Sequence, residues 1–228
     1  MENNGFNKIN EIYKYSDNRD KLIKVISYVS KLISIYCKDK NKNIANSFFT
    51  LYVTTSSSRQ VFNLFRSFFE PKIFVLISEL KTQKKDSTKN NNYQIILNII
   101  EQISTFFFFI FDNLYLFYKI NFIKNKKGSL ISLFTNFFHL IILIIKIINN
   151  LEKISELIKS KSSSTEKEFK IKLIKLLIIL SGILSDLMSV LNRLKIFKYI
   201  FKTNINETII CLTGIWSGLV SLYKAIFF

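Results

Sequence analysis

The sequence is poor in the residues that interrupt helices. It has one proline, Pro71, and five glycines among its 228 residues. Proline removes a backbone donor and glycine weakens a helix, so both are common in folds with many turns. Their scarcity, combined with long tracts of Ile, Leu and Phe, argues against a many-turned β fold and predicts long helices.

Cysteine and histidine are also scarce, which leaves few residues for disulfides, metal binding or catalysis. Cys37 and Cys211 lie far apart and form no CxxC pattern, which argues against a disulfide framework and a zinc site. His139, the single histidine, stands in an apolar run, so catalytic triads and histidine-rich metal sites have no support. No glycine-rich nucleotide-binding motif occurs. We therefore predict a protein that is not an enzyme and uses no cofactor. We interpret His139 as packed in a helix bundle, with a pore-lining or proton-sensing group as the alternative.

Acidic residues are half as frequent as basic ones, with 16 Asp and Glu against 33 Lys and Arg. Such an excess of positive charge suits nucleic acid or an anionic phospholipid membrane. The lysines alternate with apolar residues along the chain, and no recognised nucleic-acid module is present. The charge pattern therefore predicts a membrane as the partner and no nucleic acid.

Two early segments are amphipathic. In Asp20–Lys38, polar residues recur at steps of four and three, which places them on one narrow stripe of a helix with apolar residues around the rest. Ser58–Glu70 combines a polar side with a broad arc of Val, Leu and Phe, and Pro71 closes it. We predict that both insert into a membrane surface, with the alternative that they are half-buried in the protein itself. The predicted membrane-inserting residues are Lys24, Lys31, Arg59, Val61, Phe62, Phe65, Arg66 and Phe69.

Two segments are long and apolar enough to suggest membrane spans. Gly128–Ile145 is an uncharged run that would extend roughly 27 Å as a helix, close to the thickness of a hydrocarbon core. Thr208–Tyr223 is shorter and also uncharged. We predict one or two hydrophobic spans near 128–145 and 208–223. Both flanks of the first span are basic, so the charge pattern does not orient it.

A third apolar segment, Tyr93–Ile123, carries a polar stripe. At 100° per residue, Glu101, Asp112 and Lys119 lie within about 20° of one another. Such a helix either lies in the membrane interface or turns its charges toward partner helices, so we predict an intramembrane polar stripe.

Small residues recur every four positions in the last apolar segment. Gly214 and Gly218 form a GxxxG pattern, and Ser221 belongs to a neighbouring row of small side chains. This spacing lets two helices approach closely in lipid, so we predict helix association at these residues and a homo-oligomer.

Polar stretches divide the chain without separating domains. We predict an all-α fold, a membrane-associated bundle of amphipathic helices within a single unit over 1–228. Its parts are amphipathic helices over 18–80, a polar loop over 81–92, a striped helix and candidate span over 93–145, a polar loop over 159–170, and a helix and C-terminal span over 171–228.

Five stretches, in order along the chain, resemble the peroxin-11 family. They read NRDKLIKVISY, SSSRQVFNLFR, FDNLYLFYKI, SDLMSVL and GLVSLYK, between Asn18 and Lys224. In the second stretch, Gln60 and Asn63 stand where the family commonly carries cations. This departure lowers the expected electrostatic share of membrane binding by that helix.

The resemblance implies a helical protein of the peroxisomal membrane that elongates the membrane and promotes peroxisome proliferation and fission. It also implies self-association and recruitment of a fission adaptor and a dynamin-related GTPase. A non-selective pore for small metabolites, lined by the segments over 93–145, is the alternative function. An unrelated multispan transporter is a third.

Overall fold

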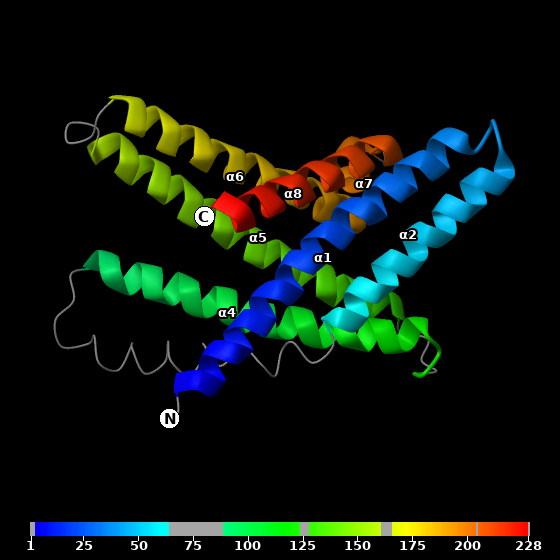
Figure 1. Cartoon of the computed structure of the whole chain (residues 1–228), viewed down its shortest axis with the longest axis horizontal. Coiled ribbons are helices and arrows are strands. Elements are labelled where there is room, and N and C mark those ends of the chain that lie inside the picture. The colour runs from blue at the N-terminus through cyan, green and yellow to red at the C-terminus, as the bar shows by residue number, and fades with distance from the viewer. Residues whose placement is uncertain (1–2, 64–88, 124–127, 161–165, 204, 228) are drawn as a thin grey trace. The chain divides into compact units, whose positions relative to one another are not determined.

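The computed structural model describes residues 3–63, 89–123, 128–160, 166–203 and 205–227. Within these ranges it consists of helices and contains no strand, which confirms the all-α prediction. The helices, coloured along the chain in Figure 1, are α1 (Asn3–Cys37), α2 (Lys42–Phe62), α4 (Lys89–Lys119), α5 (Gly128–Lys159), α6 (Glu166–Arg193), α7 (Ile196–Phe201) and α8 (Glu207–Phe227).

The chain forms two compact units. Unit 1 combines residues 1–62 with residues 150–228, and unit 2 comprises residues 63–149. Helix α5 begins in unit 2, and its last turns, from Asn150 onward, belong to unit 1. Unit 1 therefore joins the two ends of the chain, while unit 2 is built from continuous sequence.

In unit 1, α1 lies beside both α2 and α8, and α6 lies beside α8. The turn between α1 and α2 is closed by Asn41, whose side-chain oxygen accepts hydrogen bonds from the backbone N–H groups of Asn43 and Ile44. These bonds satisfy donors that the first turn of α2 would otherwise leave without a helical partner. The short turn makes α1 and α2 an antiparallel hairpin.

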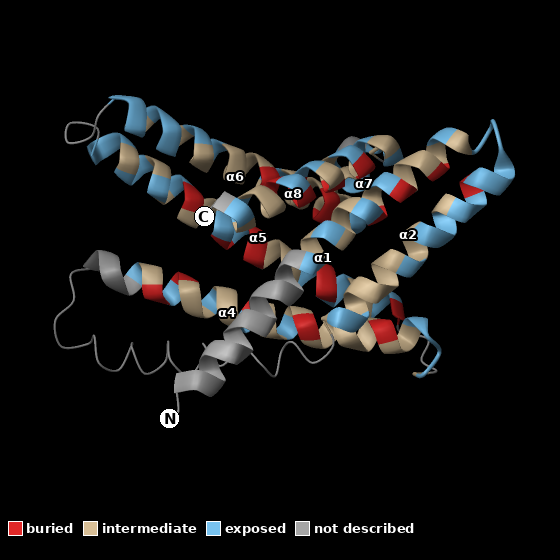
Figure 2. Cartoon of the chain, in the orientation of Figure 1, coloured by how far each residue is buried: buried red, intermediate tan, exposed pale blue. Residues whose placement is uncertain are grey.

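The polar stripe of α1 faces the interior of unit 1. Ser27, Ser30 and Ser34 are buried, whereas Leu22 and Ile26 are 50% and 41% exposed. From Arg19 onward, buried and exposed residues thus alternate along this helix with a helical period (Figure 2). This is the reverse of the arrangement that a water-soluble bundle would adopt, in which the apolar face is buried.

Glycines bring α8 close to its neighbours. A Cβ atom on Gly214 would lie 2.6 Å from the ring of Tyr28 in α1, and one on Gly218 would lie 2.6 Å from Val25. On α6, a Cβ atom on Gly182 would lie 2.6 Å from Val220 of α8. Because real Cβ atoms do not approach so closely, a larger residue at any of these three positions would force Tyr28, Val25 or Val220 to shift.

Unit 2 contains α4 and most of α5, which pack through aromatic rings. Phe111 stacks on Phe134 and Phe138 with ring centroids 5.1 and 5.7 Å apart, and Phe107 stacks on Phe138 at 5.1 Å. The pairing of 107 with 138 and of 111 with 134 shows that the two helices are antiparallel. At the end of this hairpin, Gly128 lies directly against the ring of Tyr118.

Four helices in the described part of the chain are long and apolar enough to cross a membrane. They cover Tyr93–Lys119, Gly128–Lys159, Glu166–Arg193 and Glu207–Ile226. The second and fourth contain the two spans predicted from the sequence. The other two, Tyr93–Lys119 and Glu166–Arg193, carry a few charged residues and were not predicted as spans from the sequence.

Candidate functional site

The charged residues of the α1 stripe pair with other helices of unit 1. Nε of Arg59 donates to Oδ1 of Asp20 at 2.9 Å, and its Nη2 donates to Oδ2 at 3.1 Å. The two side chains are only 26% and 15% exposed. A two-pronged guanidinium–carboxylate pair of this kind is both strong and geometrically specific, so it fastens the end of α2 to α1.

Two lysines of the same stripe reach α6 and α8. Nζ of Lys24 lies 2.6 Å from Oδ1 of Asp186, and Nζ of Lys31 lies 3.3 Å from Oε2 of Glu207. The pair with Asp186 is largely buried, whereas Glu207 remains exposed. Asp20, Lys24 and Lys31 thus each pair with a different helix, and the three pairs together set the rotation of α1 in the unit.

The surroundings stabilise the charged forms of these cations. Burial acts to lower the pKa of Arg59, but the hydrogen bond to the Asp20 carboxylate and the negative charges of Asp20 and Asp186 together outweigh burial, and the pKa rises. Burial likewise acts to lower the pKa of Lys31, and the charges of Tyr52 and Glu207 reverse the shift, so this pKa also rises. Both cations therefore remain protonated throughout the physiological pH range.

The outer side of α1 presents an apolar row, which we call the apolar ridge: Leu22, Ile26, Val29 and Tyr36. Their spacing of four, three and seven residues places them on one face of the helix. On α2, Val61 and Phe62 are also exposed, and the guanidinium carbon of Arg19 lies 3.9 Å from the centre of the Phe62 ring. Unit 1 thus has a polar interior along α1 and apolar side chains outside.

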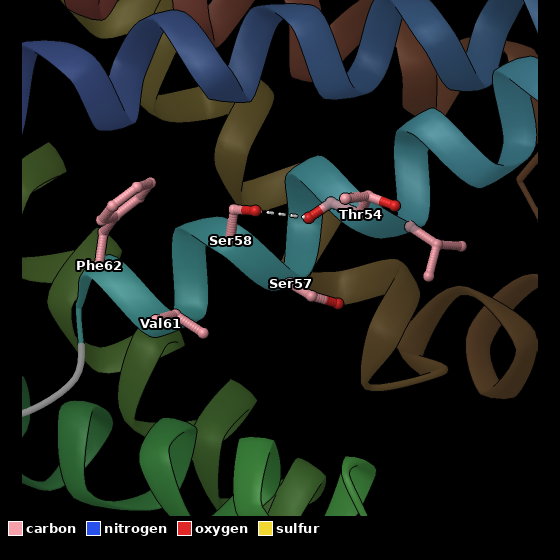
Figure 3. A pocket seen from close by; sticks show the side chains of 6 residues that line it. Thr54, Ser57, Ser58, Val61 and Phe62 are labelled. Carbon is pink, nitrogen blue, oxygen red and sulfur yellow. Dashed lines mark hydrogen bonds between the residues drawn. The ribbon is translucent and has the colours of Figure 1, made fainter.

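The last turns of α2 carry a shallow hollow of about 410 Å³ (Figure 3). It is lined by Val53, Thr54, Ser57, Ser58, Val61 and Phe62. The hydroxyl of Ser58 donates to the carbonyl oxygen of Thr54 at 2.9 Å, so this polar group is satisfied within the helix. The hollow therefore offers mainly an apolar surface at the segment for which the sequence predicts membrane insertion.

The predicted membrane-inserting residues occupy different surroundings. Val61 and Phe62 are exposed, whereas Arg59, Lys24 and Lys31 pair with carboxylates of other helices in unit 1. Three more predicted residues lie outside the described part of the chain, namely Phe65, Arg66 and Phe69. Membrane insertion by the whole set remains a prediction.

The predicted helix-association residues contact α1 or lie next to residues that do. Gly214 and Gly218 lie against Tyr28 and Val25 of the same chain. The hydroxyl of Ser221 donates to the carbonyl oxygen of Ser217 at 2.8 Å. These glycines thus serve packing within the chain, and association between copies remains a prediction.

The predicted polar stripe lies on α4 in unit 2. Along this helix, Glu101 and Asp112 are about three turns apart, and Asp112 and Lys119 are about two turns apart. The hydroxyl of Thr105 donates to the carbonyl oxygen of Glu101. The ring of His139 lies 5.0 Å from that of Phe108, which agrees with our interpretation of His139 as packed against a neighbouring helix.

Sequence reasoning missed the acidic partners of the α1 stripe. The spacing places Asp20 on the stripe, but it does not predict the pairing of Asp20 with Arg59. It also does not predict Asp186 and Glu207 as partners of the lysines. Their acidic character in otherwise apolar helices was the available signal, because such residues in apolar helices almost always find a charged partner.

The fold and the exposed apolar side chains of unit 1 define a class of protein. It is an all-helical protein with apolar outer faces and four helices long and apolar enough to cross a membrane. Within that class, the chain belongs to the family described as Peroxisomal biogenesis factor 11 (PEX11), which matches residues 6–226. This confirms the resemblance to the peroxin-11 family. The family is peroxisomal, acts in peroxisome biogenesis and is generally non-enzymatic. No curated protein matches the chain. No solved structure matches it either.

Proposed function

We propose that this protein inserts amphipathic helices into the peroxisomal membrane, curves and elongates it, and so promotes peroxisome proliferation and fission. The observation that supports this proposal most directly is the orientation of α1. Its serines and lysines face inward, while its apolar ridge faces outward. Exposed apolar rows are costly in water and favourable in lipid. The hairpin of α1 and α2 is the inserting element, and α8 is an anchor.

The apolar contribution dominates this insertion. Each large apolar side chain moved out of water contributes roughly 1.5–3 kcal/mol on the scale of core burial, less for partial insertion. A cation near anionic headgroups contributes about 1 kcal/mol, but Lys24, Lys31 and Arg59 already hold carboxylates in the protein. We therefore expect membrane binding through α1 to weaken little as the salt concentration rises.

The proposal extends to partners that act together with membrane bending. We propose that copies of the chain associate with one another, and that the protein cooperates with a fission adaptor and a dynamin-related GTPase. Many inserted copies in one area would add their deformations, and a constricting GTPase would then complete division.

The test uses the purified full chain reconstituted with giant vesicles that contain anionic phospholipid. Ile26→Glu places a charge on the apolar ridge, and we expect several-fold fewer or shorter tubules than with the original chain. Asn46→Glu adds the same charge at an exposed polar position of α2 and serves as the matched control. Circular dichroism and thermal unfolding establish that both variants retain the helical fold.

Two outcomes would contradict the proposal. Equal tubulation by the original chain and Ile26→Glu would show that the apolar ridge of α1 does not enter the bilayer. Vesicle leakage without tubulation, reduced by Asp112→Asn, would support a pore instead.

A further inference from the structure

One end of unit 1 gathers the turn between α1 and α2, the end of α6, helix α7 and the start of α8. The pairing of Lys31 with Glu207, of Tyr28 with Gly214 and of Val25 with Gly218 shows that α1 and α8 are antiparallel. The last turns of α1 therefore lie beside the first turn of α8. We call this part of the molecule the turn end of unit 1.

A groove opens between α1 and α8 at the turn end. Its volume is about 370 Å³, and its lining consists of Leu32, Ile33, Ile35 and Tyr36 of α1 with Thr208 of α8. The lining is almost wholly apolar, and the backbone N–H of Thr208 is already bonded to the side chain of Asn206. The groove thus favours an apolar occupant of the size that small-ligand sites hold.

The turn end is strongly basic. Residues 38–42 and 193–207 contain seven basic and two acidic residues. The basic residues are Lys38, Lys40, Lys42, Arg193, Lys195, Lys198 and Lys202. By contrast, the first seven residues of α6, 166–172, which begin at the opposite end of that helix, contain three basic and two acidic residues. An anionic group is therefore attracted to the turn end rather than to the start of α6.

Tyr36 connects the groove with the basic turn. Its ring lines the groove and is 69% exposed, and Nζ of Lys40 lies 4.1 Å from the ring centre. The same Nζ donates to the Tyr36 hydroxyl oxygen at 2.8 Å. A tyrosine and a lysine in this arrangement are typical of the headgroup level of a membrane, where an apolar body meets a polar surface.

We propose that the groove is a binding site for one anionic phospholipid. An acyl chain occupies the apolar groove, and the phosphate lies at the turn, within reach of Lys38, Lys40 and Lys42. An amphiphile with one negative headgroup matches both halves of the site, whereas a neutral lipid would use only the groove. This inference rests on the proposed membrane function, because it requires the turn end to reach the headgroup level.

The test measures lipid binding by the purified full chain in detergent, using native mass spectrometry with phosphatidylinositol or phosphatidylcholine added. We expect one tightly retained phosphatidylinositol and a preference of about 10- to 100-fold over phosphatidylcholine, since each lysine near an anionic group is worth about fivefold in affinity. The triple variant Lys38→Gln, Lys40→Gln, Lys42→Gln should lose most of this preference.

Two further variants separate the halves of the site. Ile33→Trp fills the groove and should reduce retention of both lipids, with circular dichroism reporting whether the fold is kept. Removal of the same charge from the region around α7, by Lys195→Gln, Lys198→Gln and Lys202→Gln, is the matched control and should leave most of the preference. Equal effects of the two triple variants would overturn the assignment of the phosphate to the α1–α2 turn.

The result also separates this inference from the proposed function, because binding in detergent requires no membrane bending. A chain that tubulates vesicles but retains phosphatidylinositol no better than phosphatidylcholine would overturn the lipid site alone. A chain that retains the lipid but does not tubulate vesicles would overturn the proposed function alone.

Discussion

Units 1 and 2 pack their apolar helices through different kinds of side chain. In unit 1, glycine and serine bring α1, α6 and α8 into close backbone contact, and ion pairs join α1 to its neighbours. In unit 2, stacked phenylalanine rings fill the space between α4 and α5, whose backbones are consequently farther apart.

The difference indicates which unit tolerates amino-acid substitutions in its helix contacts. Close packing through small residues has one geometry, because any added atom meets a neighbouring helix. Rings are larger and can shift or be replaced by other apolar side chains at a moderate cost. We therefore expect unit 1 to be the more sensitive to substitution.

The largest effect is expected for Gly214→Leu in unit 1. The new side chain would meet the ring of Tyr28, and overpacking of this kind costs about 3 kcal/mol at the upper end of its usual range. Thermal unfolding of the full chain in detergent should show a midpoint lower by several degrees. Ala225→Leu, a similar enlargement at a half-exposed position of the same helix, is the control. A Gly214→Leu midpoint equal to that of the control would refute close packing of α8 on α1.

A smaller effect is expected for the pair of Asp20 and Arg59. Asp20→Asn leaves a mostly buried guanidinium without its counter-charge, at a cost of about 2 kcal/mol, between the values for exposed and buried pairs. Combining it with Arg59→Gln should cost less than the sum of the single changes, since the second change removes the uncompensated charge.

The control for this pair is Glu166→Gln, which breaks the exposed pair of Glu166 with Lys170 and should cost less than about 0.5 kcal/mol. Equal and negligible effects of Asp20→Asn and Glu166→Gln would mean that Arg59 does not fasten α2 to α1.

The smallest effect concerns the rings of unit 2. Phe111→Leu and Phe138→Leu each retain an apolar side chain, and a double-mutant cycle should give a coupling of about 1 kcal/mol from the lost stacking. Chemical denaturation of the full chain supplies the four free energies. Strict additivity of the two changes would show that the rings do not interact, and it would remove the contrast between the two units.

Much of the fold could be predicted from local pattern. The scarcity of glycine and proline and the helical period of the stripes lead to the helices that the structure contains. The glycine spacing in 214–218 marked residues that do pack closely on another helix, although the sequence suggested a second copy of the chain and the structure shows α1. The sequence does not identify Tyr93–Lys119 and Glu166–Arg193 as spans, because an apolar helix with a few charged residues also fits a helix that lies in the membrane interface.

The direction of the α1 stripe could not be predicted in the same way. Periodicity establishes that Lys24 and Lys31 share one side of a helix, but the same pattern fits a side turned to headgroups and a side turned inward. Only the positions of Asp186 and Glu207, more than 150 residues away, distinguish the two.

The sequence by itself determined the helices, their two-faced character and the membership in a family of peroxisomal biogenesis factors, because these depend on residues near one another along the chain. The tertiary structure alone decided that the cations of α1 and the end of α2 pair with carboxylates and that the apolar ridge faces outward. The physical reason is that a charge needs a partner in a medium of low polarity, and which partner it finds depends on which helices the fold brings together.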